Sequence, residues 1–201
     1  MTAIPIAIID TRAANLASVE AGLSRVGFAP HRTVDKGEVE RAAHVVLPGV
    51  GAFGEGAKQL EELGLIDPLR QRLDDNRPLL AVCLGLQLLF ESSEESEGAR
   101  GLGVFRGRVE RFREATIVPQ LGWNKVEGGR LVEPGYAYFA NSYRVSAAPQ
   151  GTVASFAHHG ERFVAAIEKG RLLACQFHPE LSGAWGHALL ERWREKVTAS
   201  C

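Results

Sequence analysis

The chain has 201 residues, 45% of them hydrophobic, and a nearly balanced charge, with 23 Lys and Arg against 24 Asp and Glu. These values are ordinary for a globular protein, and we expect one domain over residues 1–201. A net charge of −1 gives no electrostatic footprint for nucleic acid or an anionic membrane. No apolar run reaches the ~20 residues of a transmembrane helix, and the N-terminus has no signal-peptide pattern. The composition therefore predicts a cytoplasmic protein that binds neither nucleic acid nor membrane.

The first 90 residues alternate between short apolar runs, typical of buried strands, and segments with helical periodicity. Strands are predicted at residues 4–9, 45–47 and 79–82, and helices at residues 15–26, 53–63, 66–74 and 84–90. Because strand and helix alternate, we expect parallel strands joined by right-handed crossovers. This part of the chain is predicted to be an α/β sheet with helices on both faces.

The pattern changes after a polar, acidic stretch at residues 91–97. Short alternating runs separated by Gly and Pro then indicate antiparallel strands and hairpins. These strands are predicted at residues 107–112, 136–139, 144–146, 153–156, 163–167 and 172–177, and a last helix at residues 184–197. The chain is therefore predicted to have a parallel half followed by an antiparallel half.

Three cysteines, Cys83, Cys175 and Cys201, are too few and too widely spaced for a disulfide framework or a CxxC metal site. The pair His158 and His159 has no acidic or Cys partner nearby and is assigned to a hairpin turn. We therefore expect no metal and no cofactor. Cys175 lies on a predicted strand, which is typical of a core position, and Cys201 ends the chain.

Cys83 stands where an apolar strand runs directly into a helix, with Gly85 two residues later. A sharp strand-to-helix turn of this kind exposes a nucleophile, and small neighbours let the backbone approach closely. The helix N-terminus favours the thiolate, and the N–H of Leu84 is placed to bind a developing oxyanion. The alternative is a buried Cys that acts as a small hydrophobic residue.

His178 and Glu180 lie in a Gln-Phe-His-Pro-Glu segment after a predicted strand. In an extended segment, residues two apart point to the same side, so the carboxylate is expected to orient the imidazole. With Cys83 they complete a nucleophile, base and orienting acid. Taken alone, this segment favours a surface His-Pro-Glu turn, and only the combination with Cys83 favours a catalytic role.

Residues 48–54, Pro-Gly-Val-Gly-Ala-Phe-Gly, match the G-x-G-x-x-G pattern between a strand and a helix. A dinucleotide site normally uses the first strand–helix turn, whereas this motif follows a later strand. The alternative is that Val50 and Gly51 supply a peptide that can flip and complete an oxyanion hole facing Cys83. Trp123, in a Gly-Trp-Asn run, is compatible with a partner surface.

Together these segments resemble class I glutamine amidotransferases and, more narrowly, the glutaminase subunits of imidazole glycerol phosphate synthases. The resemblance covers nearly the whole chain. Its anchors are LPGVGAFG at 47–54, VCLGLQLLF at 82–90, GLGV at 101–104 followed by GRVERF at 107–112, PQLGWN at 119–124, YFANSY at 138–143 and QFHPE at 176–180. It implies a flavodoxin-like α/β fold.

The resemblance also implies a role for each matching residue. Cys83 attacks the glutamine carboxamide, His178 transfers the proton, and Glu180 orients His178. Val50, Gly51 and Leu84 form the oxyanion hole. The substrate glutamine is held by Gln87, Glu95, Ser142 and Tyr143. A γ-glutamyl thioester forms, ammonia leaves, and water then releases glutamate.

In this family, ammonia passes unprotonated to a (β/α)8-barrel cyclase subunit, so the resemblance implies a heterodimer. There ammonia converts a phosphoribosyl ribulotide into imidazole glycerol phosphate and an aminoimidazole carboxamide ribotide. This places the chain among hydrolases that act within a lyase complex. The matching interface residues are Pro119, Leu121, Trp123 and Asn124.

Several positions depart from the family pattern. Leu181 stands where a Lys often reaches the partner, and Arg12 and Ala14 are bulkier than the usual residues of the first turn. Gln120 and Asn141 both stand where His is common, and we expect them to keep a polar contact across the site.

Two other functions remain open from the sequence alone. One is the glutaminase subunit of a different synthase, such as one for pyridoxal phosphate or purines. The other is a non-catalytic binding module on the same fold.

Overall fold

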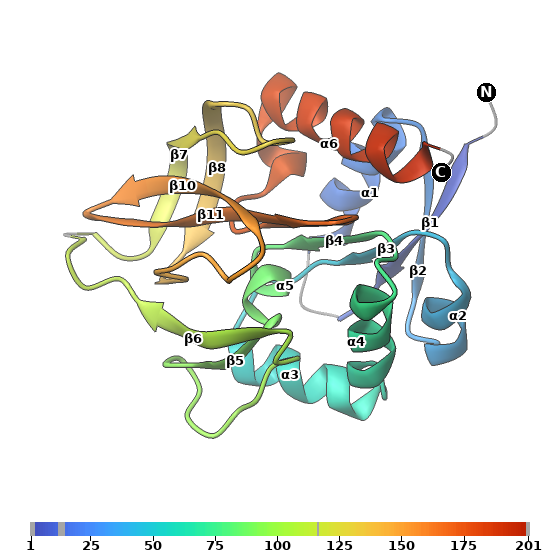
Figure 1. The fold of residues 1–201 in the computed structure, drawn as a ribbon, viewed down its shortest axis with the longest axis horizontal. Coiled ribbons are helices and arrows are strands. Elements are labelled where there is room, and N and C mark those ends of the chain that lie inside the picture. The colour runs from blue at the N-terminus through green and yellow to red at the C-terminus, as the bar shows by residue number, and fades with distance from the viewer. Residues whose placement is uncertain (1–2, 12–14, 116, 200–201) are drawn as a thin grey trace.

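In a computed structural model of the chain, residues 3–11, 15–115 and 117–199 are described. Within them, nine strands form one sheet in the order β2-β1-β3-β4-β12-β11-β10-β7-β8 (Figure 1). The parallel strands are β1 (Ile4–Ile9), β2 (Phe28–Thr33), β3 (Val45–Leu47), β4 (Leu79–Val82) and β12 (Leu172–Cys175). The strands that continue the sheet by antiparallel pairing are β11 (Glu161–Lys169), β10 (Val153–His159), β7 (Gln120–Glu127) and β8 (Gly135–Asn141). The parallel order 2-1-3-4 with a fifth strand beyond it is that of flavodoxin-like folds.

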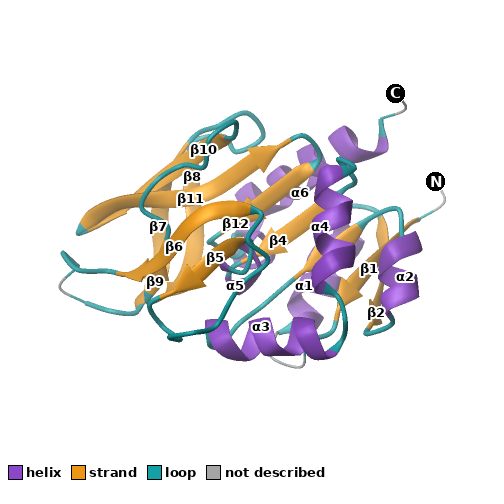
Figure 2. Ribbon diagram, turned by 60° about the horizontal axis from the view of Figure 1, so that its bottom comes forward, coloured by secondary structure: helices purple, strands orange, loops and turns teal. Residues whose placement is uncertain are grey.

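The helices cover both faces of the parallel strands. In Figure 1, α1 (Leu16–Arg25) and α6 (Gly183–Thr198) lie on one face. The other face carries α2 (Lys36–Arg41), α3 (Phe53–Glu62) and α4 (Ile66–Asp74), and α4 lies in front of the sheet in Figure 2. Each layer buries its own apolar cluster, so the sheet lies between two cores. This arrangement confirms the predicted α/β class.

Apolar spacing explains how the two helices of the first face pack. In α1, Leu16, Val19 and Leu23 are buried and lie on one side of the helix. They meet the buried face of α6, which includes Leu190 and Trp193. The two helices therefore cover the sheet through matched apolar stripes.

A second, smaller sheet stands beside the main one. It contains β5 (Phe90–Ser93), β6 (Phe105–Arg111) and β9 (Tyr143–Arg144). Strands β5 and β6 pair in parallel, whereas β6 and β9 are antiparallel. This sheet brings the segment after the elbow next to residues 142–143.

The structure corrects the helix predicted at residues 84–90, because α5 covers only Leu84–Gln87 and β5 begins at Phe90. That segment is almost wholly apolar, and periodicity cannot separate a buried helix from a buried strand. Strand β2 was missed because it contains Pro30 and polar residues, which suit the edge position it occupies. Strand β7 was missed because its Gly122 reads as a loop signal; its φ is +125°.

Helix α2 was also missed in the sequence. It spans only six residues and is held at its start by Asp35, whose carboxylate accepts a hydrogen bond from the Glu38 N–H. Among the described residues, no helix combines the length and the apolar character needed to cross a bilayer.

Candidate active site

Cys83 lies at the carboxyl end of β4, at the start of α5. Its backbone is in an unusual conformation, with φ at 54° and ψ at −107°. A positive φ in a non-glycine residue stores strain and persists only where the surroundings hold it. The Cys83 N–H donates to the carbonyl of Cys175 at 2.7 Å, which ties the turn to β12. This is the strained elbow that the sequence predicts for a nucleophile.

Gly85 lets the elbow approach β3. A Cβ at this position would lie 2.0 Å from the carbonyl oxygen of Leu47, so any side chain would clash there and prevent the close approach of the two backbones. The glycine is therefore required by packing, since it allows α5 to begin directly against the end of β3.

His178 and Glu180 are buried together after β12. His178 Nδ1 lies 2.8 Å from Glu180 Oε1, and the His178 N–H donates to the Tyr138 carbonyl on β8 at 2.9 Å. With Nδ1 engaged by the carboxylate, Nε2 is the nitrogen left for proton exchange. The predicted contact is present, although it forms differently: His178 is extended, whereas Pro179–Leu181 make a short 3-10 turn (η1) that brings Glu180 back to the ring.

The electrostatic surroundings of His178 favour its protonated form. Burial alone would lower its pKa. Hydrogen bonds with Cys83 and Glu180 and their charges overcome that effect and raise the pKa of His178 to about 10. The imidazole is thus placed between the thiol and the carboxylate, in position to carry a proton.

A cavity of about 270 Å³ opens at Cys83. It is smaller than the ~300–1,000 Å³ typical of sites for drug-sized ligands, which suits a small metabolite. The predicted residues that line it are Val50, Gly51, Cys83, Leu84, Gln87, Glu95, Pro119, Ser142 and Tyr143. Ala140 and Asn141 also line it and were not predicted as substrate-site residues.

One wall of this cavity is an amide network that includes a residue missed in the sequence. Gln87 Nε2 donates to the Tyr143 carbonyl at 3.2 Å and to Gln176 Oε1 at 2.9 Å. Gln176, which is fully buried, has its Nε2 3.7 Å from Cys83 Sγ. Its position two residues before His178 was the signal that could have found it, because residues two apart in an extended segment share a side.

Glu95 and Ser96 cap the N-terminus of α3. The Phe53 N–H donates to Glu95 Oε2 at 2.7 Å, and the Gly54 N–H donates to Ser96 Oγ at 3.0 Å. A dinucleotide pyrophosphate binds at this kind of helix N-terminus. Since a carboxylate already occupies it, the dinucleotide interpretation of residues 48–54 is not supported.

The oxyanion-hole residues are close to the thiol but are not arranged as predicted. The Leu84 N–H donates to the Gly49 carbonyl at 3.2 Å and so is engaged within the protein. Gly51 has a φ of +103°, and a Cβ there would meet nothing within 4 Å. The 49–51 segment therefore has the space and the backbone freedom to change conformation.

The predicted partner residues lie on β7 or just before it. Leu121 and Trp123 are 70% and 58% exposed, which is unusual for large apolar side chains. Pro119 instead lines the cavity, and Asn124 Nδ2 donates to the His158 carbonyl at 2.8 Å. Ile117 and Tyr136 are also exposed and were missed in the sequence, and Leu181, at the position where a Lys often reaches the partner, is 39% exposed. We call Leu121, Trp123 and Tyr136 the docking face, because their strand register places them on one side of β7 and β8.

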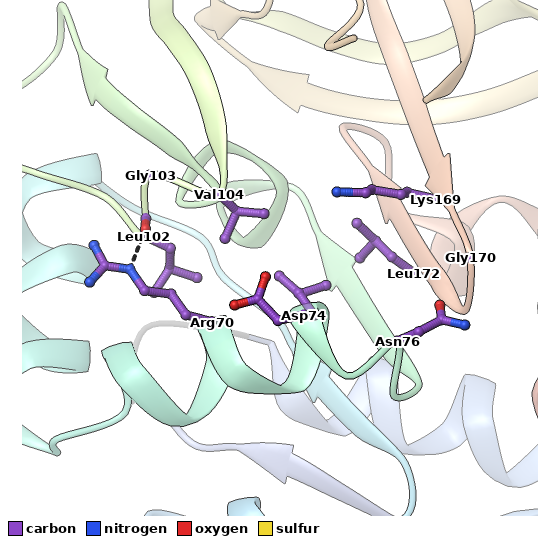
Figure 3. Close-up of a pocket in the computed structure, with 10 residues that line it drawn as sticks. Arg70, Asp74, Asn76, Leu102, Gly103, Val104, Lys169, Gly170 and Leu172 are labelled. Atoms are coloured by element: carbon purple, nitrogen blue, oxygen red, sulfur yellow. Dashed lines mark hydrogen bonds between the residues drawn. The ribbon is translucent and has the colours of Figure 1, made fainter. Parts of the chain in front are cut away.

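A larger cavity, of about 550 Å³, lies away from Cys83 (Figure 3). Asp74 and Lys169 point into it, whereas Arg70 is turned toward the carbonyl of Leu102, to which its Nε donates at 2.6 Å. It contains no Cys or His side chain. Cavity size alone would therefore point to the wrong end of the sheet.

The remaining predicted positions have structural roles or lie outside the described residues. Cys175 is fully buried, and burial raises the pKa of its thiol, which makes it unreactive. His158 and His159 were predicted in a hairpin turn, but they are the last paired residues of β10, just before the turn at Gly160. Among the described residues, no group of three His, Cys, Asp or Glu could hold a metal ion. Arg12, Ala14 and Cys201 are not among the described residues.

Sequence comparison agrees with the site. A family model described as glutamine amidotransferase class-I matches residues 11–196. The chain is 39% identical over 199 residues to the imidazole glycerol phosphate synthase subunit HisH of Symbiobacterium thermophilum, covering 96% of this chain and 94% of that protein. It is 41% identical over 201 residues to the same subunit of Aquifex aeolicus, covering 94% and 96%.

Solved structures share the fold. One described as a crystal structure of glutamine amidotransferase superposes with a TM-score of 0.77 at 20% identity, covering 96% of this chain and 99% of that one. PurLQS from Thermotoga maritima gives 0.73 at 14% identity, with 97% of each chain covered.

These matches decide between the classes expected from the sequence. The lyase class is wrong in detail for this chain, because the matched domain is an amidotransferase domain and covers nearly all of it. The chain belongs to the class I glutamine amidotransferases and, within that family, to the HisH glutaminase subunits of imidazole glycerol phosphate synthase, which act in histidine biosynthesis.

Proposed function

We propose that this chain hydrolyses L-glutamine to glutamate and ammonia at Cys83, with His178 as proton carrier and Glu180 as its orienting acid. One observation carries the proposal. The strained Cys83 backbone faces a cavity of about 270 Å³ and lies beside an imidazole that is hydrogen-bonded to a buried carboxylate at 2.8 Å. No other part of the described chain combines a nucleophile, a base and an orienting acid.

The chemistry follows from this arrangement. Cys83 gives its thiol proton to His178 as the sulfur attacks the carboxamide carbon, and His178 passes that proton to the leaving nitrogen. The C–N bond breaks, ammonia leaves, and a γ-glutamyl thioester remains on Cys83. Water, deprotonated by His178, then attacks the thioester and releases glutamate and the thiol. Glu180 keeps the imidazole in the orientation and tautomer that both steps need.

The walls of the cavity suit an amino-acid substrate. Glu95 is the carboxylate that lines the cavity. One of its oxygens accepts from the Phe53 N–H, and the other would accept from the substrate ammonium group, while Gln87, Ser142 and Tyr143 supply polar groups around it. The oxyanion needs a donor, and the Leu84 N–H becomes available only if its bond to the Gly49 carbonyl is lost. We propose that a reorientation of the Val50–Gly51 peptide completes the hole.

We further propose that ammonia passes to a (β/α)8-barrel cyclase subunit bound at the docking face. The support is the exposure of Leu121 and Trp123, beside Pro119, which lines the cavity. A short, dry path would keep ammonia from being protonated by water. A cytoplasmic location stays a prediction, which cell fractionation would test.

Replacing Cys83 tests the catalytic proposal. We expect Cys83→Ala and Cys83→Ser to lower glutamine hydrolysis by about 10⁴-fold or more, because loss of the nucleophile removes the covalent route. An electrophilic glutamine analogue should label Cys83 and leave the buried Cys175 unmodified, as peptide mass spectrometry would show. Glutamate production by Cys83→Ala at the native rate would exclude the proposal.

Replacing Trp123 tests the docking face. We expect Trp123→Ala to weaken binding to the cyclase subunit by about 30-fold, as large aromatic interface residues do. Its thermal stability should change little, because the ring is 58% exposed. Surface plasmon resonance would measure the affinity, with Tyr136→Phe as the matched control that keeps the apolar area. Unchanged binding by Trp123→Ala would place the partner elsewhere.

A further inference from the structure

Gln120 and Asn141 form a buried polar pair that the protein itself does not satisfy. They face each other across β7 and β8 in the strand register, and they are 4% and 5% exposed. Among the described residues, neither Oε1 nor Nε2 of Gln120 has a hydrogen-bond partner, and neither does Asn141 Oδ1. The polar contact expected between the two side chains is not made. Three buried polar atoms are therefore left open in one place, which is uncommon in native proteins.

The orientation of Asn141 is set by its surroundings. Its Nδ2 donates to the carbonyl of Tyr143 at 2.9 Å. Turning the amide over would bring two oxygens together, so Oδ1 must be the atom that stays open. For Gln120, either orientation leaves one donor and one acceptor open. The pair thus presents two acceptors and one donor.

This pair adjoins the cavity of the nucleophile, on the side of β7 and β8 opposite to the docking face. Asn141 lines the cavity of Cys83, and the carbonyl of the preceding Ala140 is 3.9 Å from Cys83 Sγ. Gln120 follows Pro119, another cavity residue, and precedes Leu121, which is 70% exposed on the docking face. A small molecule released at the sulfur therefore has the Asn141 amide in the wall of its cavity, with Gln120 paired beside Asn141 on the same face of the strands.

We propose that Gln120 and Asn141 form a binding site for ammonia as it leaves the active site; this inference rests on the proposed glutaminase function. Ammonia donates to two acceptors and accepts from one donor, which matches the open atoms. Both amides are neutral, so they bind ammonia without giving it a proton. Water can also donate to two acceptors and accept from one donor, so the two molecules must be separated by experiment.

A first experiment determines whether the site binds a small molecule. A crystal structure of the full chain at a resolution that orders internal solvent should show one molecule within hydrogen-bond distance of Gln120 and Asn141. A collapsed pair, in which the two side chains bond each other, would overturn the proposal.

A second experiment separates ammonia from water, using the complex with its cyclase subunit. The measured quantity is the fraction of glutamine nitrogen that reaches the cyclase product, against ammonia lost to solution. We expect Gln120→Met, similar in length but unable to hydrogen-bond, to lower this fraction about fivefold, the effect of one lost hydrogen bond. Gln120→His, which keeps a polar group, should restore most of it.

The contrary outcomes are distinct. An unchanged delivered fraction in Gln120→Met overturns the ammonia site. If a γ-glutamyl thioester also accumulates on Cys83, detected by mass spectrometry, the pair positions the hydrolytic water instead. If Gln120→Met does not fold, Gln120→Leu and Gln120→Thr serve in the same assay. Failure of the native chain to form glutamate would refute the proposed function itself, which these variants do not decide.

Discussion

Strands β4 and β12 lie side by side, and their two ends differ in every property that matters for catalysis. At the carboxyl end, a cavity of about 270 Å³ holds Cys83 and adjoins the buried His178 and Glu180. At the amino end, a cavity of about 550 Å³ is bordered by the exposed side chains of Asp74 and Lys169. The strained backbone of Cys83 and the raised pKa of His178 belong to the smaller cavity, whereas the other cavity is distinguished only by its larger volume.

The difference shows which observations locate chemistry in an α/β protein. The carboxyl ends of parallel strands lie at the same end of the sheet, and the loops that follow several strands converge there. Thus the 49–51 segment after β3, Cys83 after β4 and His178 after β12 meet although they are far apart in the chain. At the amino ends of β4 and β12, the residues that line the larger cavity include no Cys or His. Substitutions at the two ends of these strands should therefore have unequal effects on stability and on activity.

Gly85→Ala should have the largest effect on stability among the variants that sharpen this contrast. The added Cβ would meet the Leu47 carbonyl at 2.0 Å, so the elbow must move and the free energy of unfolding should fall by about 3 kcal/mol. Glutaminase activity should fall with it. Gly37→Ala in α2 is the control, since its Cβ would meet the movable end of the Arg41 side chain at 2.9 Å and Asp35 Oδ1 at 3.4 Å, and no backbone atom. Equal denaturation midpoints for both variants would show that the elbow is not packed as described.

His178 should make stability depend on pH. Its pKa is raised from the ordinary value to about 10, so its stabilising effect is complete below about pH 6.5 and is lost as the pH rises toward 10. The difference in unfolding free energy between the native chain and His178→Gln should shrink across that range. A tenfold change in proton affinity corresponds to about 1.4 kcal/mol, which urea titrations at several pH values can resolve. A difference that grows with pH would contradict the buried imidazolium.

The double variant Asp74→Ala, Lys169→Ala should have the smallest effect. Both side chains are exposed at the larger cavity, and changes at such positions alter stability by about 0.5 kcal/mol or less. Glutamine hydrolysis should stay within experimental error of the native rate. A large loss of activity would mean that the cavity at the amino ends of β4 and β12 contributes to catalysis, and it would remove the contrast between the two ends of these strands.

Much of the site could be predicted because its residues carry their own local signals. Cys83 sits between an apolar strand and a glycine-containing turn, and His178 and Glu180 flank a proline. These signals depend on residues next to each other in the chain. The oxyanion geometry could not be predicted in this way, since the bond from Leu84 to Gly49 depends on how two segments pack.

The parts of the fold that were missed have physical reasons as well. Strand β2 pairs with β1 alone at the edge of the sheet, where polar side chains and Pro30 are tolerated, so its sequence lacks an apolar run. Strand β7 has alternating exposure, but its Gly122 suggested a loop. In both cases pairing with a distant strand outweighed local preference.

The hydrogen bond from the Cys83 N–H to Cys175 links the nucleophile to a strand that lies near the end of the chain. During synthesis, the elbow leaves the ribosome long before β12 and His178 exist to hold it. Pairing between segments so distant in sequence forms late in folding. The strained thiol therefore acquires its active geometry only after β12 and His178 are made, and products truncated before them would carry an ordinary, unactivated cysteine.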